Sequence, residues 1–183
     1  MMINKHAIIA ILLVATVGLG CSFFPKKGGA YQGTLDNFSI DFPAGSGDVK
    51  VDSASANWAP SGRTYSKNFD GRSENYRTYE VQAWQMDPSR TDGKDLRTIL
   101  EIGLNGWGDE PGTVVRDVTV NGRKGIDSVR TMELGPVKMT FRHVVFWSEK
   151  TKTLFIVGVT ATKKENVATA EADAFVNSFD FGG

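Results

Sequence analysis

The sequence contains only one cysteine, Cys21, and only two histidines, of which His143 alone follows Cys21. One thiol excludes a disulfide within the chain, and one histidine without a second thiol cannot form a transition-metal site or a histidine relay. Basic and acidic residues are equal in number, 21 of each, and they are interspersed along the chain. Binding of nucleic acid requires a basic patch, so we predict no nucleic-acid partner. We also predict no metal and no cofactor.

Long hydrophobic runs are also missing, because the apolar stretch from Ala7 to Gly20 is too short for a permanent membrane-spanning helix. It follows Lys5 and ends at Cys21, which is the organisation of an export signal. The last residues before Cys21 resemble a bacterial lipobox, which implies cleavage before Cys21 and attachment of lipid to its thiol. Gly18 stands where that motif usually carries leucine. Cleavage by an ordinary secretory peptidase, giving a soluble secreted protein, therefore remains the alternative.

This pattern divides the chain into three parts. Residues 1–20 are expected to be a cleaved signal peptide, residues 21–33 a lipidated cysteine with a tether, and residues 34–183 one globular domain. Lys26 and Lys27 lie close to the expected anchor, where they either attract an anionic membrane surface or simply solvate the tether. A domain of this length buries enough surface to fold without disulfides or metals.

Alternation of apolar and polar residues predicts strands, and apolar residues at helical spacing predict two helices. Turn residues between 44 and 62 predict mostly loop there, with a short strand near 49–51. The predicted helices are 94–105 and 163–177, the second opened by a capping box between Thr162 and Glu165. The predicted strands are 38–42, 64–69, 76–86, 114–120, 125–132, 137–148, 153–161 and 179–181.

The segments 137–148 and 153–161 are apolar on both faces near their shared turn, which predicts a hairpin at the centre of the sheet. A strand that is buried on both sides needs cover on both sides. We therefore predict an α+β fold in which an antiparallel β-sheet is sandwiched between helices, with the four strands from 114 to 161 forming a meander.

None of the reactive residue types forms a recognisable active site. His143 lies among alternating apolar residues and is interpreted as a buried structural histidine. Ser46 lacks the frame of a nucleophile elbow and is interpreted as a turn residue. The segment 122–125 has neither the spacing nor the following helix of a phosphate loop and reads as a basic β-turn. Asp109 and Glu110 lack a calcium-loop pattern and read as solvated. No catalytic residue is predicted.

Three tryptophans, Trp58, Trp84 and Trp107, lie beside predicted loops or at the ends of predicted elements. Two interpretations remain open for them. They either cap the hydrophobic core or line a groove for an apolar or sugar-like ligand.

Three short patterns, taken in order, resemble the PsbP-like superfamily, especially its DcrB-type branch of bacterial envelope lipoproteins. They are the opening segment from Phe38 to Pro43, the segment from Gly122 to Asp127, and the closing segment from Phe175 to Phe181. The resemblance spans residues 33 to 183. It implies an antiparallel sheet between helices and a non-enzymatic accessory or assembly role, and no functional residue carries over from it.

Three hypotheses follow for the function. The first is a non-catalytic accessory or protein-interaction module of the bacterial cell envelope, anchored to the membrane through lipid on Cys21 and facing the periplasm or the outside. The second is a carrier or sensor of a small apolar or glycan ligand. The third, an enzyme, is the least supported because the sequence contains no reactive constellation.

Overall fold

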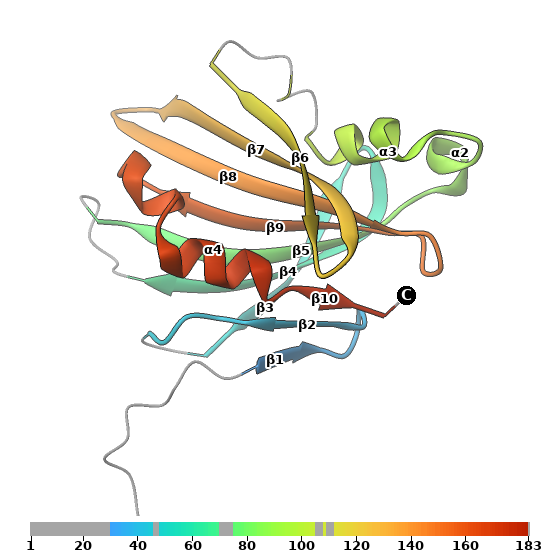
Figure 1. Cartoon of the computed structure of the whole chain (residues 1–183), viewed down its shortest axis with the longest axis horizontal. Helices are drawn as coiled ribbons and strands as arrows, with labels where there is room; N and C mark the ends of the chain where they lie inside the picture. Colours follow the sequence, from blue (N-terminus) through green and yellow to red (C-terminus); the bar gives the residue numbers. More distant parts are fainter. Residues whose placement is uncertain (1–29, 46–47, 70–74, 105–107, 109–111, 183) are drawn as a thin grey trace, which may run out of the picture.

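The computed structural model describes residues 30–45, 48–69, 75–104, 108 and 112–182. Their helical elements are α2 (Pro88–Thr91), α3 (Leu96–Gly103), the 3-10 turn η2 (Lys164–Val167) and α4 (Ala170–Asn177). The strands are β1 (Ala30–Gly33), β2 (Phe38–Asp41), β3 (Lys50–Ala56), β4 (Ala59–Phe69), β5 (Arg77–Gln85), β6 (Val114–Val120), β7 (Arg123–Leu134), β8 (Val137–Ser148), β9 (Thr153–Ala161) and β10 (Asp180–Phe181). Figure 1 shows their arrangement.

The strands form two antiparallel sheets. The larger has the order β3-β4-β5-β9-β8-β7-β6, and the smaller has the order β1-β2-β10. Strands β6 to β9 are consecutive neighbours, which confirms the predicted meander. The strand β9 also pairs with β5, for example Val157 with Val81, and this pairing joins β6–β9 to β3–β5 in one open sheet.

The strands β8 and β9 occupy the middle of the large sheet, as predicted from their apolar residues. Every residue of β9 is buried, and its side chains alternate between two hydrophobic clusters on opposite faces. Phe155 and Val157 belong to one cluster, whereas Leu154 and Ile156 belong to the other. The sheet is therefore covered on both faces along this hairpin.

The two faces are covered by different structures. One face packs against the small sheet and α4, through apolar residues that include Phe38 of β2 and Phe175 of α4, and against Phe179 between α4 and β10. The other face packs against α3 through Ile99 and Leu100. Figure 1 shows α4 and the small sheet on one side of the large sheet and α3 at the other. The α+β class and the antiparallel sheet are confirmed, but the predicted sandwich between helices is not found, because strands supply much of the cover on one face.

The segment 44–62, predicted to be mostly loop, contains β3 and the first residues of β4. β3 is an edge strand whose residues are largely exposed. Small polar residues are therefore sufficient to form this strand, and it lacks the alternation of apolar and polar residues that indicates a half-buried strand. Residues 30–33, assigned to the tether from the sequence, form β1 and pair with β2, Tyr31 lying opposite Ile40.

The second predicted helix is shorter and begins later than expected. Residues 164–167 form η2, and α4 starts only after Thr169, whose hydroxyl accepts a hydrogen bond from the amide of Ala172 at 3.1 Å. The capping box at Thr162 is not formed. Val167 is almost completely buried, and its carbonyl accepts a hydrogen bond from Arg142. Docking of this residue interrupts the helical path between 163 and 169.

The first predicted helix, 94–105, is α3 at Leu96–Gly103, and the short helix α2 before it was not predicted. Among the described residues no helix is long and apolar enough to cross a membrane.

Candidate functional site: the groove between α3 and the β6–β7 hairpin

The helix α3 is fixed at both ends by local interactions. Asp95 caps its N-terminus, because the carboxylate accepts hydrogen bonds from the amide and hydroxyl of Thr98 at 3.0 and 2.7 Å. At the other end, Gly103 lies so close to β8 that a Cβ atom there would be 2.7 Å from Cγ1 of Val145. The helix therefore packs closely on the centre of the sheet at Gly103, and the face of its first turn borders a groove.

The hairpin of β6 and β7 forms the other side of the groove. Its turn consists of Asn121 and Gly122, which both have positive φ, as expected for a tight hairpin with this sequence. The segment 122–125, interpreted as a basic β-turn, is a turn only at Gly122, because Arg123, Lys124 and Gly125 already belong to β7 and pair with β6. Thr119 and Lys124 lie opposite each other in the register. Asp117 lies two residues before Thr119 on β6, so its side chain projects from the same face of the sheet.

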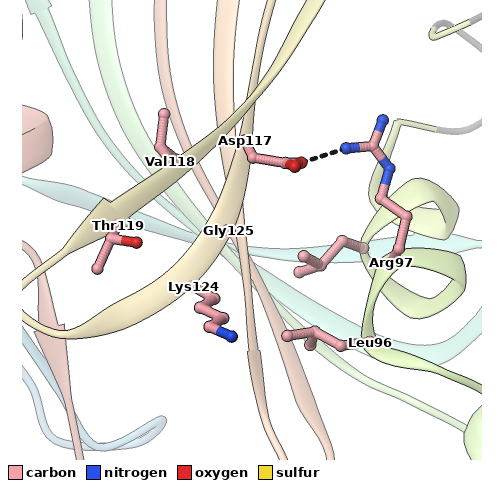
Figure 2. Close-up of a pocket in the computed structure, with 8 residues that line it drawn as sticks. Leu96, Arg97, Asp117, Val118, Thr119, Lys124 and Gly125 are labelled. Atoms are coloured by element: carbon pink, nitrogen blue, oxygen red, sulfur yellow. Dashed lines mark hydrogen bonds and ion pairs between the residues drawn. The ribbon is translucent and has the colours of Figure 1, made fainter.

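The groove between these elements has a volume of about 660 Å³. The described residues that line it are drawn in Figure 2; they are Leu96, Arg97, Leu100, Asp117, Val118, Thr119, Lys124 and Gly125. Two of its charges are paired: Arg97 reaches across from α3 to Asp117 and also donates to Glu101 at 2.6 Å. The hydrogen bond to Glu101 is the main reason that the pKa of Arg97 is raised.

Lys124 differs from Arg97, since it makes no hydrogen bond or ion pair with any residue in the described part of the chain. Both Lys124 and Leu96 line the groove. The described lining thus combines aliphatic surface, one hydroxyl, one internal ion pair and one cation. It contains no nucleophile with an adjacent base, which is the arrangement that covalent catalysis requires.

A second polar cluster lies on the same face of the sheet, where Glu80 and His143 flank Gly158. Gly158 is the register partner of both. A Cβ atom at Gly158 would lie 3.0 Å from His143 and 3.1 Å from Glu80, so glycine allows the two side chains to approach over it. Nε2 of His143 is 3.8 Å from Oε1 of Glu80.

Burial dominates the electrostatics of this cluster. It lowers the pKa of His143 to about 4, assisted by the positive charge of Arg130, so the imidazole is neutral at pH 7. Burial also raises the pKa of Glu80. The contact between Glu80 and His143 is therefore a polar contact and not an ion pair at neutral pH. His143 is 5% exposed, as the interpretation of a buried histidine requires.

A row of hydrogen bonds continues from Glu80 along β5. Gln82 donates to Glu80 at 3.0 Å, and the indole of Trp84 donates to Gln82 at 3.0 Å. Trp84 in turn packs against Trp58, with ring centroids 4.7 Å apart. Both tryptophans belong to the cluster beneath α3, so they cap the core and do not line the groove described above.

The remaining candidates from the sequence lie outside the described residues. These are Cys21, Lys26, Lys27, Ser46, Trp107, Asp109 and Glu110. Within the described ranges no group of three histidine, cysteine, aspartate or glutamate side chains is placed to hold a metal ion.

Sequence reasoning did not identify the groove or Glu80. The groove joins a helix to a hairpin that follows it in the chain, and no spacing rule connects Leu96 with Lys124. Glu80 lies in the predicted strand 76–86, and its local sequence does not mark it as buried. Its burial results from the neighbouring strands β9 and β8, which the local sequence does not specify.

Comparisons with known proteins give a fold and no family. No family model matches the chain, and no curated protein matches it. Among solved structures, a protein from Bacteroides thetaiotaomicron superposes with a TM-score of 0.50 at 10% identity over 86% of this chain. The match spans 49% of that protein, about half of its length.

Two further structures are similar at lower scores. A protein of unknown function from Pseudomonas aeruginosa gives a TM-score of 0.43 at 11% identity, covering 78% of this chain and 87% of that one. The cyanobacterial PsbP protein of Synechocystis gives 0.46 at 9% identity, covering 88% and 97%. The solved structures that this chain is similar to thus include a PsbP protein.

Proposed function

We propose that this protein is a lipid-anchored component of the bacterial cell envelope, of the DcrB-type branch of the PsbP-like superfamily, and that it acts by binding a protein partner without catalysis. The observation that best supports a binding role is the surface formed by the groove and the neighbouring strand β6. The charged groups of the groove are either paired with each other or isolated, and its other described lining residues are aliphatic apart from Thr119 and Gly125.

The strand β6 offers a regular edge to a partner. It pairs with β7 from Val114 to Val120 without a register shift, and it is the last strand of the large sheet. Among the described residues no strand pairs with its outer side, where strand addition by a partner is geometrically possible. The opposite edge, β3, has a register shift between Ala54 and Ala56, a feature that disrupts regular pairing at sheet edges. Of these two edges, β6 is the better docking surface.

The proposed anchor is compatible with the position of the first strand. β1 begins at Ala30, so only residues 22–29 separate it from Cys21. A segment of that length spans at most about 30 Å when fully extended. A lipid on Cys21 would therefore hold the domain next to the membrane surface.

Fractionation of cells that express the unchanged chain and the Cys21→Ala variant tests the anchor. We expect the unchanged chain in the membrane fraction after a salt wash and the variant in the soluble fraction, because each acyl methylene contributes about 0.8 kcal/mol to membrane binding. A double Lys26→Gln, Lys27→Gln variant is the control and should stay in the membrane fraction. A Cys21→Ala variant that still pellets would refute the anchor.

Photo-crosslinking from β6 tests the interaction surface. A photoreactive residue at Val114, whose exposed fraction is 62%, should give a discrete crosslinked product in intact cells. The same residue at Val51 on β3, which is 45% exposed, is the matched control and should not give it. Equal products from both positions would contradict the assignment of β6 as the docking edge.

A further inference from the structure

The groove also has the chemistry of a small-molecule site, and this inference rests on its proposed binding role but not on the anchor or the protein partner. Its volume of about 660 Å³ lies within the range of about 300–1,000 Å³ that is usual for ligand pockets. The described lining combines an apolar component and a polar component, and each restricts the ligand.

The apolar component is supplied by α3. Leu96 and Leu100 are four residues apart and therefore lie one above the other on the same face of the helix. Leu100 is buried, whereas 38% of Leu96 remains exposed although it lines the groove. The aliphatic stem of Arg97 adds to this surface, since its guanidinium is held away from Leu96 by Asp117. Such a surface fits an unbranched or singly branched aliphatic chain.

The polar component is one unmatched positive charge. Arg97 is neutralised by Asp117 and Glu101, whereas Lys124 has no counterion in the described part of the chain. The hydroxyl of Thr119 lies across the hairpin from Lys124 and is able to donate a second hydrogen bond to the same oxygen acceptor. One cation with one hydroxyl favours a single anionic group over a cation or a neutral head group.

We propose that the groove binds a medium-chain fatty acid, with its carboxylate at Lys124 and Thr119 and its aliphatic chain along Leu96 and Leu100. The free acid fits the lining better than a neutral ester or alcohol, because only the acid matches the charge of Lys124. No bond is made or broken in this proposal.

Isothermal titration calorimetry with butyrate, hexanoate, octanoate and octanol tests it. The protein is the Cys21→Ala chain, which keeps every described residue. Affinity should rise with chain length by about fourfold for each methylene that the groove buries. Octanoate should bind more tightly than octanol by up to about fivefold, the effect of a solvent-exposed ion pair.

Two pairs of variants locate the site. Lys124→Gln should reduce the affinity for octanoate to that of octanol, whereas Lys138→Gln, which removes another exposed lysine, should have no effect. Leu96→Asn should weaken octanoate binding and reduce its dependence on chain length. Leu134→Asn removes a leucine of similar exposure on β7 and is its matched control.

Backbone amide chemical shifts give a test that needs no variant in the groove. Octanoate should shift the amide signals of Thr119, Lys124 and Gly125 more than those of β3. Shifts confined to other surfaces, or binding that is independent of chain length and of Lys124, would overturn the proposal. Those results would leave the membrane anchor and the crosslink from Val114 untouched, so the two proposals fail separately.

Discussion

Replacement of Asp127 by asparagine is expected to destabilise the protein by about 3 kcal/mol, because it breaks a buried charge network. The carboxylate of Asp127 is 1% exposed and accepts hydrogen bonds from Arg142 at 3.1 Å and from Arg116 at 2.7 Å. The side chain of Arg142 is itself only 8% exposed. Asparagine has nearly the same shape but no charge, so the variant leaves a buried guanidinium without its main counterion.

The size of this loss of stability depends on the contacts that Arg142 keeps in the variant. Removal of one partner from a buried ion pair costs about 3–5 kcal/mol. Arg142 also contacts Asp173 at 2.5 Å and the carbonyl of Val167 at 3.4 Å, and these contacts keep part of its compensation. The lower end of the range is therefore expected, equivalent to a fall of about 6–12 °C in Tm for a protein of this size.

Urea unfolding followed by tryptophan fluorescence measures the effect. The control is Asp180→Asn, because Asp180 is 56% exposed and 3.8 Å from Arg123, and its loss should cost less than about 1 kcal/mol. The double variant Asp127→Leu, Arg142→Met should be more stable than Asp127→Asn, since it removes both buried charges. If Asp127→Asn costs no more than Asp180→Asn, the network does not stabilise the fold as argued.

Three further predictions concern acid stability, the core and metals. The pKa of His143 is lowered to about 4 in the folded state, against about 6.5 in the unfolded state. The free energy of unfolding should therefore keep its full value above pH 6.5 and fall by about 3 kcal/mol as the pH drops towards 4. His143→Gln should flatten this part of the pH profile, and an unchanged profile would contradict the assignment. Phe155→Ala and Trp147→Ala should each lower the free energy of unfolding, measured with urea, by about 3–5 kcal/mol. Tyr76→Ala, at a half-buried position just before β5, should lower it by less than about 1.5 kcal/mol. Equal losses would show that β8 and β9 are not the structural centre. EDTA should leave Tm unchanged, and a fall of several degrees would reveal a carboxylate site for a metal.

The sequence predicts the central strands of the large sheet better than its edge strand β3. All of β9 and the second half of β8 are buried, and the consecutive apolar residues of these segments carry the hydrophobic signal. β3 is the opposite case, because an exposed edge strand such as Lys50–Ala56 is held by backbone pairing with β4 and requires little from its side chains. Its strand character therefore cannot be read from apolar alternation.

The start of α4 shows a different limit. Thr162 and Thr169 are both suitable helix caps by residue type, and the sequence favours Thr162 because Glu165 follows at the capping-box spacing. The structure selects Thr169 because Val167 is drawn into the core and Arg142 holds its carbonyl. Both interactions are tertiary. The groove has the same origin, since the distance between Leu96 and Lys124 depends on how closely Gly103 lets α3 approach β8.

The pairing of β2 with both β1 and β10 has a consequence for folding kinetics. The register joins Phe38 to Phe181, residues from opposite ends of the domain. Contacts between residues so distant in the sequence are entropically costly to form and slow the search for the native state. During synthesis, the aromatic residues of β2 lack their partners in β10 until the last residues of the domain have left the ribosome. The small sheet is therefore expected to be the last part of the domain to form, and a chain shortened before Phe179 should expose Phe38 and Phe155 and aggregate.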